Sequence, residues 1–343
     1  MKDEGERTLK IKIKNIPTNI MFLIMWLIDA FYVQNSNSYF SDYMEYYNVY
    51  NGYKQNYFEL GYYYCGLLAK MVGLNFFWFR LIIISITLIL MRNSILKYAK
   101  EPELVTLLYM MHPFLLQCIQ IRNALSIAII IYSLRYLVEK NLQIVKFIFC
   151  VIIATLFHSS AILYLIILLC IYLKPKYIVP ISVAILLIFE GMFGTYKNQI
   201  VQLLTQITHN DKIAYYLNTD VNGILTNSMI LYFIIYFVCL FVFLWCYNVK
   251  KEKNIDYILI SSSIYIFSYI PIMLVHYDYF RIFEYYFPVV IMALLNILKN
   301  KEHKYLVVKI NVILFFAAIT IMKCLIWITD NNNEVLSHSI LFK

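Results

Sequence analysis

Apolar residues in this chain gather into long runs separated by short clusters of lysine, arginine and asparagine. Most runs are about 17 to 25 residues long, which as a helix matches a bilayer hydrocarbon core roughly 30 Å thick. The sequence contains no series of segments with the alternating polarity of a barrel strand, so helices must satisfy the backbone. The pattern predicts an all-α fold, a polytopic bundle of membrane helices.

Eleven transmembrane helices are predicted, and neighbouring runs almost touch near Pro113, Arg122 and His158. A charged N-terminal tail, residues 1–16, precedes the first run without a small-residue cleavage pattern, so that run is interpreted as a retained helix. A single transmembrane domain then covers residues 17–328, and a C-terminal tail covers 329–343. The predicted helices are 17–33, 75–95, 103–120, 122–139, 143–157, 159–173, 177–194, 226–248, 255–275, 282–298 and 305–328.

The distribution of lysine and arginine sets the predicted orientation, because short cytoplasmic loops are enriched in both. Placing the N-terminus inside puts most of the 29 basic residues on the cytoplasmic side, in loops such as "KPK" and "KKEK". The odd number of helices then places the C-terminus outside. Two long polar segments, about 34–75 and 195–222, lie outside, and a short helix along the outer interface is expected within "ELGYYYCGLLAKMVGL".

Composition excludes several classes of protein. With 62% hydrophobic and 14% charged residues and a mean hydropathy of +0.68, the chain lies far from soluble domains, which are roughly 25% charged. The net charge of +9 follows the topology and predicts no nucleic-acid partner. The seven cysteines are dispersed, and no histidine or acidic pair has metal-ligand spacing, so neither a metal nor a cofactor is predicted.

Two arginines are not explained by the positive-inside pattern. Arg122 and Arg281 each open a run that follows apolar or aromatic chain, where a buried guanidinium costs about 2.5 to 3.5 kcal/mol. Arg281 has local acids, Asp278 and Glu284, for pairing. Arg122 has no acid within four positions, so either another helix supplies its partner or it binds an anion. Most of the other basic residues on the outer side or within the predicted helices, a group that contains Arg80, can be solvated.

Polar residues on the predicted outer side have a structural and a functional interpretation. His158 is either a packed residue or a general base, and the serines after it favour helix capping over nucleophilic chemistry. Asp42 and Glu59 flank a tyrosine-rich stretch. These acids are either solvated or bind sugar hydroxyls, and the tyrosines either form an interfacial belt or stack on sugars.

Five motifs, in order, resemble one family: "SDYMEYYNVY", "FELGYYYCGLLAKMVG", "IRNALSIAIIIYSLRYL", "FHSSAILYL" and "YFRIFEYYF". This series is similar to the EpsG family of Wzy-like bacterial polysaccharide polymerases over roughly residues 20–300. Asn123 stands where the family more often has glutamine. The resemblance implies a membrane glycosyltransferase of the bacterial cytoplasmic (inner) membrane.

The implied reaction joins oligosaccharide repeat units carried on polyprenyl pyrophosphate at the outer face of that membrane, in the synthesis of O-antigen, exopolysaccharide or capsule. The implied partners are this lipid-linked oligosaccharide, membrane lipid, a flippase and a chain-length regulator.

The resemblance also assigns site residues. Arg122 and Arg281 would neutralise the departing pyrophosphate, and His158 or Asp42 would take the proton of the attacking hydroxyl. By similarity, Asp42, Glu59, Arg122, His158 and Arg281 match the family's motif positions, and we expect the acceptor to be oriented by Glu59, Tyr43, Tyr46, Tyr62 and Tyr285.

Two other functions fit a chain of this kind. A multi-span sugar O-acyltransferase has a similar number of helices, but commonly carries its polar signature on the cytoplasmic side. A flippase or transporter for lipid-linked oligosaccharides would be expected to show paired repeats and broken helices near mid-membrane.

Overall fold

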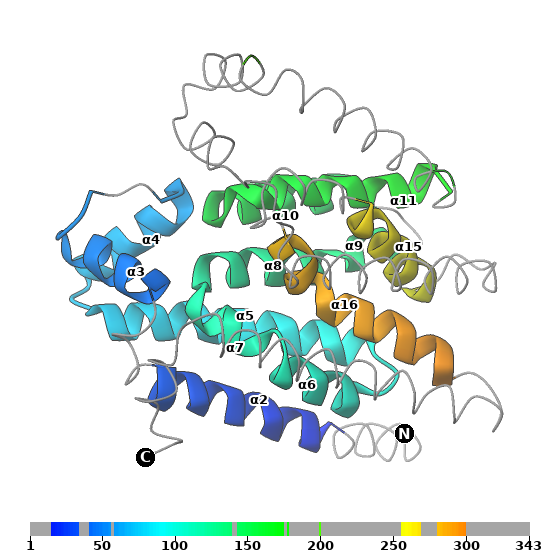
Figure 1. The fold of residues 1–343 in the computed structure, drawn as a ribbon, viewed down its shortest axis with the longest axis horizontal. Helices are drawn as coiled ribbons and strands as arrows, with labels where there is room; N and C mark the ends of the chain where they lie inside the picture. The colour runs from blue at the N-terminus through cyan, green and yellow to red at the C-terminus, as the bar shows by residue number, and fades with distance from the viewer. Residues whose placement is uncertain are drawn as a thin grey trace, which may run out of the picture. The chain divides into compact units, whose positions relative to one another are not determined.

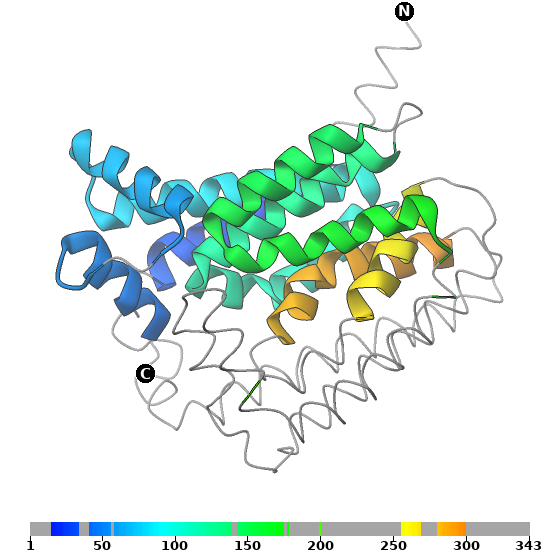
Figure 2. The same ribbon diagram turned by 90° about the horizontal axis from the view of Figure 1, so that it is seen from above.

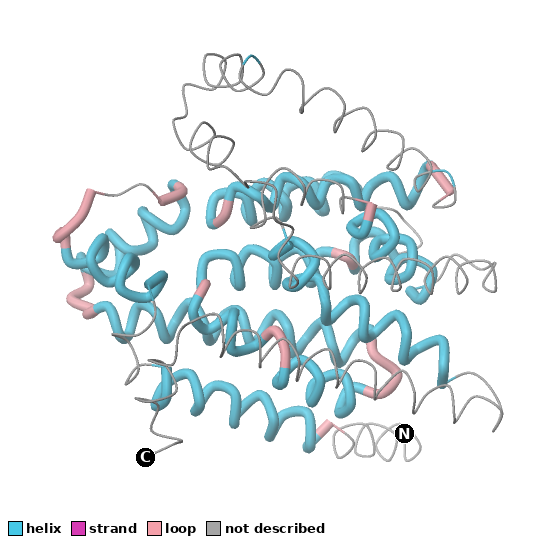
Figure 3. The backbone as a smooth tube through the Cα atoms, viewed as in Figure 1, coloured by secondary structure: helices cyan, strands magenta, loops and turns pink. Residues whose placement is uncertain are grey.

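The computed structural model describes residues 15–33, 41–55, 58–138, 143–174, 177, 199, 255–268 and 280–299. In these ranges the chain is helical with short connecting loops and contains no strand (Figure 3). The predicted all-α class is confirmed for this part of the chain. The helices predicted over 177–194, 226–248 and 305–328, and the outer segment 195–222, lie outside the described residues, apart from residues 177 and 199.

The chain divides into two compact units. The first contains residues 1–165, 253–259 and 285–343, and the second contains 166–252 and 260–284. The helices described in the first unit are α2 (Ile16–Ile28), the π-helical η1 (Asp29–Val33), α3 (Ser41–Asn51), α4 (Leu60–Met71), α5 (Phe76–Tyr98), α6 (Pro102–Met111), α7 (Phe114–Ile119), α8 (Ile121–Ser133), α9 (Arg135–Val138) and α10 (Ile144–Phe157). Four more helices are described: η3 (Ser159–Leu168), α15 (Ile255–Phe267) and α16 (Phe280–Lys299) are divided between the units, and α11 (Leu169–Tyr172) lies in the second.

Helix α8 is the centre of the first unit and lies between α5 and α10 (Figure 1). Its side chains Ile121, Ala124, Ile127, Ala128 and Ile131 are fully buried. The two alanines lie one turn apart and leave room for close approach of neighbouring helices, as small residues do in membrane bundles. This packing fixes the N-terminal end of α8, where the unexplained Arg122 stands.

Several helices predicted as continuous are divided. The segment predicted over 103–120 forms α6 and α7, which meet at His112 and Pro113. Proline lacks the backbone donor and restricts the residue before it, so the helix stops there. The segment predicted over 159–173 forms a 3-10 helix followed by a short α-helix. By length and composition, two described helical stretches can cross a membrane, Phe76–Tyr98 and Ile121–Val138, and the other apolar helices are shorter.

The described residues of the segment predicted as outer, 41–55 and 58–75, are largely helical. They contain α3 and α4, which lie together at one end of the first unit in both ribbon views (Figure 2). The helix expected within "ELGYYYCGLLAKMVGL" is confirmed as α4. Asn75 then caps α5 by accepting a hydrogen bond from the backbone N–H of Trp78 at 3.2 Å.

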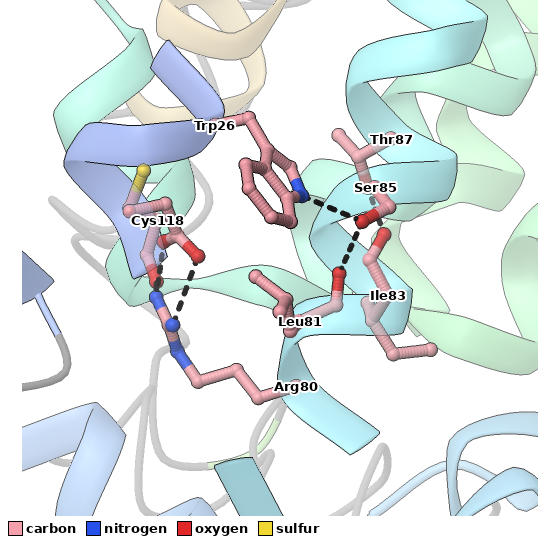
Figure 4. Close-up of polar contacts among 8 residues, drawn as sticks. Trp26, Arg80, Leu81, Ile83, Ser85, Thr87 and Cys118 are labelled. Carbon is pink, nitrogen blue, oxygen red and sulfur yellow. Dashed lines mark hydrogen bonds and ion pairs between the residues drawn. The ribbon is translucent and has the colours of Figure 1, made fainter. Parts of the chain in front are cut away.

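Arg80 is an exception to the solvation expected of most basic residues on the outer side or within the predicted helices, because its side chain is buried. It is 1% exposed and forms an ion pair with Asp29, which is 0% exposed. Its Nη1 donates to Asp29 Oδ2 at 2.9 Å, and its Nη2 donates to Asp29 Oδ1 and, at 2.9 Å, to the Cys118 carbonyl. Figure 4 shows the guanidinium reaching the Cys118 backbone, while Trp26 donates to Ser85 Oγ at 2.9 Å. These bonds join η1, α5 and α7.

A second polar cluster joins the α5–α6 loop to α15 and α16. Lys100 Nζ donates to Asp256 Oδ2 at 2.8 Å and to the Asn296 carbonyl at 3.1 Å. The Asn296 amide donates to the Tyr98 carbonyl at 2.7 Å and to Asp256 Oδ1 at 3.0 Å. Each polar atom here has a protein partner, so the cluster fixes the packing of these helices.

In the second unit, α11 contacts the described end of α15. Tyr265 donates to the carbonyls of Leu169 and Leu173 at 3.3 and 3.1 Å, and Phe267 stacks on Phe283 with 6.0 Å between ring centroids.

Candidate active site

Arg122 lies in the first turn of α8 and forms an ion pair with Glu59, the residue that precedes α4. Arg122 Nη1 donates to Glu59 Oε2, and the side chains of Arg122 and Glu59 are 16% and 21% exposed. Of the two alternatives for Arg122, a partner from another helix is therefore present. Both side chains keep part of their surface exposed.

Aromatic rings surround the guanidinium of Arg122. Its Cζ lies 4.0 Å from the ring centroid of Phe58, 5.1 Å from that of Tyr46 and 5.9 Å from that of Tyr62. Rings in this position attract a cation through their quadrupoles and hold its planar fork in one orientation. The Nε atom is buried and, among the described residues, has no hydrogen-bond partner.

Glu59 connects Arg122 to the start of η3. Its second oxygen, Oε1, accepts a hydrogen bond from the backbone N–H of Ser159 at 3.1 Å. Burial alone would raise the pKa of Glu59, but the charges of Arg122 and His158 and the Ser159 N–H together hold that pKa below its ordinary value of 4.5. The carboxylate is therefore ionised at neutral pH and holds three segments together.

His158 ends α10 and directs its ring towards Ser160. Nδ1 lies 3.3 Å from the backbone nitrogen of Ser160 and 2.8 Å from its Oγ. A backbone N–H can only donate, so Nδ1 is the acceptor in this contact and a neutral ring carries its proton on Nε2. In this geometry the proton of a neutral His158 is on Nε2, so the ring can donate a hydrogen bond from that atom. The sequence had allowed either a packed residue or a general base at this position.

Asp42 and Tyr285 meet through Gln120, the residue before α8. Gln120 Nε2 donates to Asp42 Oδ2 at 2.8 Å, and Tyr285 donates to Gln120 Oε1 at 2.7 Å. Asp42 lies in the first turn of α3, and Tyr285 lies on α16. Gln120 is two positions before Arg122, so this chain of hydrogen bonds lies at the same end of α8.

Three tyrosines predicted at the site, Tyr43, Tyr46 and Tyr62, are buried in one aromatic cluster. Tyr43 packs edge-on against Phe76 at 5.4 Å between centroids, with the Arg80 guanidinium 5.5 Å from its ring. Tyr46 and Tyr62 contact each other at 5.8 Å. Burial raises the pKa of both hydroxyls, which therefore stay protonated. That these rings orient a sugar acceptor stays a prediction.

Arg281 lies on the part of α16 that belongs to the second unit and is half-buried. Its predicted role beside Arg122 stays a prediction. The described residues contain no group of three histidine, cysteine or acidic side chains able to hold a metal ion.

Sequence reasoning missed two parts of this region. The sequence shows Gln120 only as a polar neighbour of Arg122, yet its side chain connects Asp42 to Tyr285. The pair between Asp29 and Arg80 was also missed, although Asp29 is the single charged residue in the run 17–33. An acid alone in an apolar run is costly unless it is paired, and that was the available signal.

Comparison with known proteins agrees with the motif series. A search of curated proteins and a search of solved structures each returned no match. The sequence model of the EpsG family matches residues 15–339, nearly the whole chain. The chain therefore belongs to the EpsG family, whose members are Wzy-like polysaccharide polymerases.

Proposed function

We propose that the protein joins oligosaccharide repeat units carried on polyprenyl pyrophosphate, at the outer face of the bacterial cytoplasmic membrane in which it is a multi-pass protein. The growing chain is transferred from its lipid pyrophosphate to a sugar hydroxyl of a new lipid-linked unit. A flippase supplies the units and a chain-length regulator acts on the product. Membership of the EpsG family supports the general activity.

The observation that carries the proposal is the state of Arg122. Its guanidinium is oriented by Glu59 and by aromatic rings, and part of the side chain is exposed. A guanidinium held in this way is suited to donating charge-assisted hydrogen bonds to a phosphate oxygen. One such contact to a developing charge is commonly worth about 2.7 to 4 kcal/mol of the barrier.

Residues at this end of α8 can receive both the leaving group and the proton of the transfer step. The acceptor hydroxyl oxygen forms a bond to the anomeric carbon, and the bond from that carbon to the phosphate oxygen breaks. The electron pair leaves with the pyrophosphate towards Arg122, and the hydroxyl proton passes to Asp42, whose carboxylate is oriented by Gln120. His158 donates from Nε2 to the leaving phosphate.

The proposal is tested in a strain that lacks the gene. We expect single repeat units on the lipid carrier to accumulate at the outer leaflet, and the wild-type gene to restore polymer. Units that accumulate at the inner leaflet would instead indicate a flippase. Loss of sugar acyl groups with normal polymer length would indicate an acyltransferase.

A further inference from the structure

Gln120 stands in the first unit between two helices that hold its backbone in place. Its N–H donates to the Leu116 carbonyl of α7 at 2.9 Å, and its own carbonyl accepts from the Ala124 N–H of α8 at 3.0 Å. The Gln120 side chain is buried, so it extends from a fixed point into the protein. Both ends of its amide are hydrogen-bonded, Nε2 to Asp42 and Oε1 to Tyr285.

The two partners determine the orientation of the Gln120 amide. An ionised carboxylate can only accept hydrogen bonds, so the amide has to turn its NH2 group towards Asp42. Its oxygen then faces Tyr285, whose hydroxyl is the donor at 2.7 Å. Without that donor the buried amide oxygen would lose its partner, which is costly. Tyr285 therefore stabilises the orientation in which Gln120 donates to Asp42.

Tyr285 and Asp42 differ in exposure. Tyr285 is 0% exposed, so its ring and hydroxyl are closed to a substrate that arrives from outside the protein. Asp42 is half-buried, and Gln120 holds it at Oδ2. A carboxylate has a second oxygen with lone pairs of its own. The hydrogen bond from Gln120 therefore leaves Oδ1 for a substrate hydroxyl.

We infer that Tyr285 is a positioning residue for the reaction and acts through Gln120, not by contact with the sugar acceptor. The chain of two hydrogen bonds holds Asp42 so that Oδ1 faces the hydroxyl whose proton it takes. This inference rests on the proposed function, in which Asp42 receives that proton. Small displacements of Asp42 lower the rate strongly, because reacting atoms have to stand about 3 to 3.5 Å apart.

Tyr109 provides a matched control. Its hydroxyl donates to Gln117 Oε1, and both side chains are buried in the first unit. Gln117 Nε2 has no hydrogen-bond partner in the described part of the chain, so this bond leads no further. Tyr109→Phe therefore removes a buried bond from tyrosine to glutamine, as Tyr285→Phe does, but without a connection to Asp42. A loss of stability alone would affect both variants alike.

The experiment measures polymerisation by purified variants in proteoliposomes, with lipid-linked repeat units extracted from the deletion strain as substrate and melting temperature as a control for folding. We expect Tyr285→Phe to lower kcat about tenfold and to leave KM unchanged, and Tyr109→Phe to leave both near the wild-type values. Gln120→Glu keeps an acceptor for Tyr285 but has no N–H for Asp42, so we expect a larger loss in kcat. Equal losses in Tyr285→Phe and Tyr109→Phe, or a raised KM with unchanged kcat in Tyr285→Phe, would overturn the inference.

A second comparison is made in an Asp42→Asn background, where the carboxylate is absent. Tyr285→Phe should then lower the residual rate by less than about twofold, because the residue through which it acts has been removed. A further loss of about tenfold would mean that Tyr285 acts independently of Asp42 and would overturn the inference. An Asp42→Asn protein with the wild-type rate would also overturn it.

Failure of this inference is distinct from failure of the proposed function. A wild-type protein that makes polymer while Tyr285→Phe and Tyr109→Phe lose activity equally is a polymerase in which Tyr285 has no positioning role. A wild-type protein that makes no polymer from these repeat units would contradict the proposed function itself, and this inference with it.

Discussion

Arg122 and Glu59 form an ion pair although they stand 63 positions apart in the chain. The pair joins the first turn of the central helix α8 to the residue that begins α4. It therefore connects the buried core of the first unit to the outer segment. Replacing either residue affects both the packing of these segments and the charge of the site.

Replacing Glu59 by glutamine removes the counter-charge and leaves the Arg122 guanidinium half-paired. We expect the free energy of unfolding to fall by roughly 2 kcal/mol, between the values for exposed and fully buried pairs. Thermal unfolding in detergent measures this loss. In the double variant Glu59→Gln/Arg122→Gln, part of the loss should be recovered, whereas simple addition of the two single effects would mean that the pair contributes no coupling.

The same pair predicts a pH dependence. The pKa of Glu59 is lower in the folded protein than its ordinary value of 4.5, so the stabilisation is complete above that value and is lost as pH falls through the folded pKa. The difference in melting temperature between wild type and Glu59→Gln should not shrink from pH 7 to about 5. It should shrink under more acidic conditions, and a difference that shrinks already between pH 7 and 5 would contradict this assignment.

The buried pair of Asp29 and Arg80 has a structural role. Asp29→Asn leaves the Arg80 charge without its partner in a fully buried place, and we expect a loss of about 3 to 5 kcal/mol in stability. Polymer should disappear together with folded protein, as followed by size-exclusion chromatography. Normal amounts of folded Asp29→Asn protein would show that the pair is dispensable.

Gly61 allows α4 to approach α10 closely. A Cβ at this position would lie 2.7 Å from the Leu156 carbonyl oxygen and 2.8 Å from its Cβ, so Gly61→Ala forces the helices apart and should cost about 1 to 3 kcal/mol. Gly66→Ala on the same helix meets only ordinary contacts and serves as the control. Equal melting temperatures of the two variants would contradict the observed packing.

The sequence predicted helices well and their interruptions poorly. Runs such as 75–95 and 143–157 match α5 and α10 because apolar length and flanking charge determine them locally. The break at His112 and Pro113 follows from the proline, which the length of an apolar run does not take into account. The 3-10 geometry after His158 has no signal in hydropathy.

The sequence indicates which residues are candidates for the site, but not which of them contact each other. Arg122 stood out because a guanidinium in an apolar run needs a partner, but the sequence does not say that Glu59 is that partner. Arg80 belongs to a group of basic residues of which most can be solvated, and only the fold brings Asp29 to it. Asp42 and Tyr285 likewise become neighbours only through Gln120.

The central claim is that the fork of Arg122 stabilises a departing lipid pyrophosphate. The most direct measurement is the polymerisation rate of purified wild type and Arg122→Lys in proteoliposomes, with polyprenyl-pyrophosphate-linked repeat units as substrate and thermal unfolding as a control for folding. Lysine keeps the charge and loses the paired donors, so a folded variant should be slower by about 100-fold or more. A folded Arg122→Lys protein that makes polymer at the wild-type rate would contradict the claim.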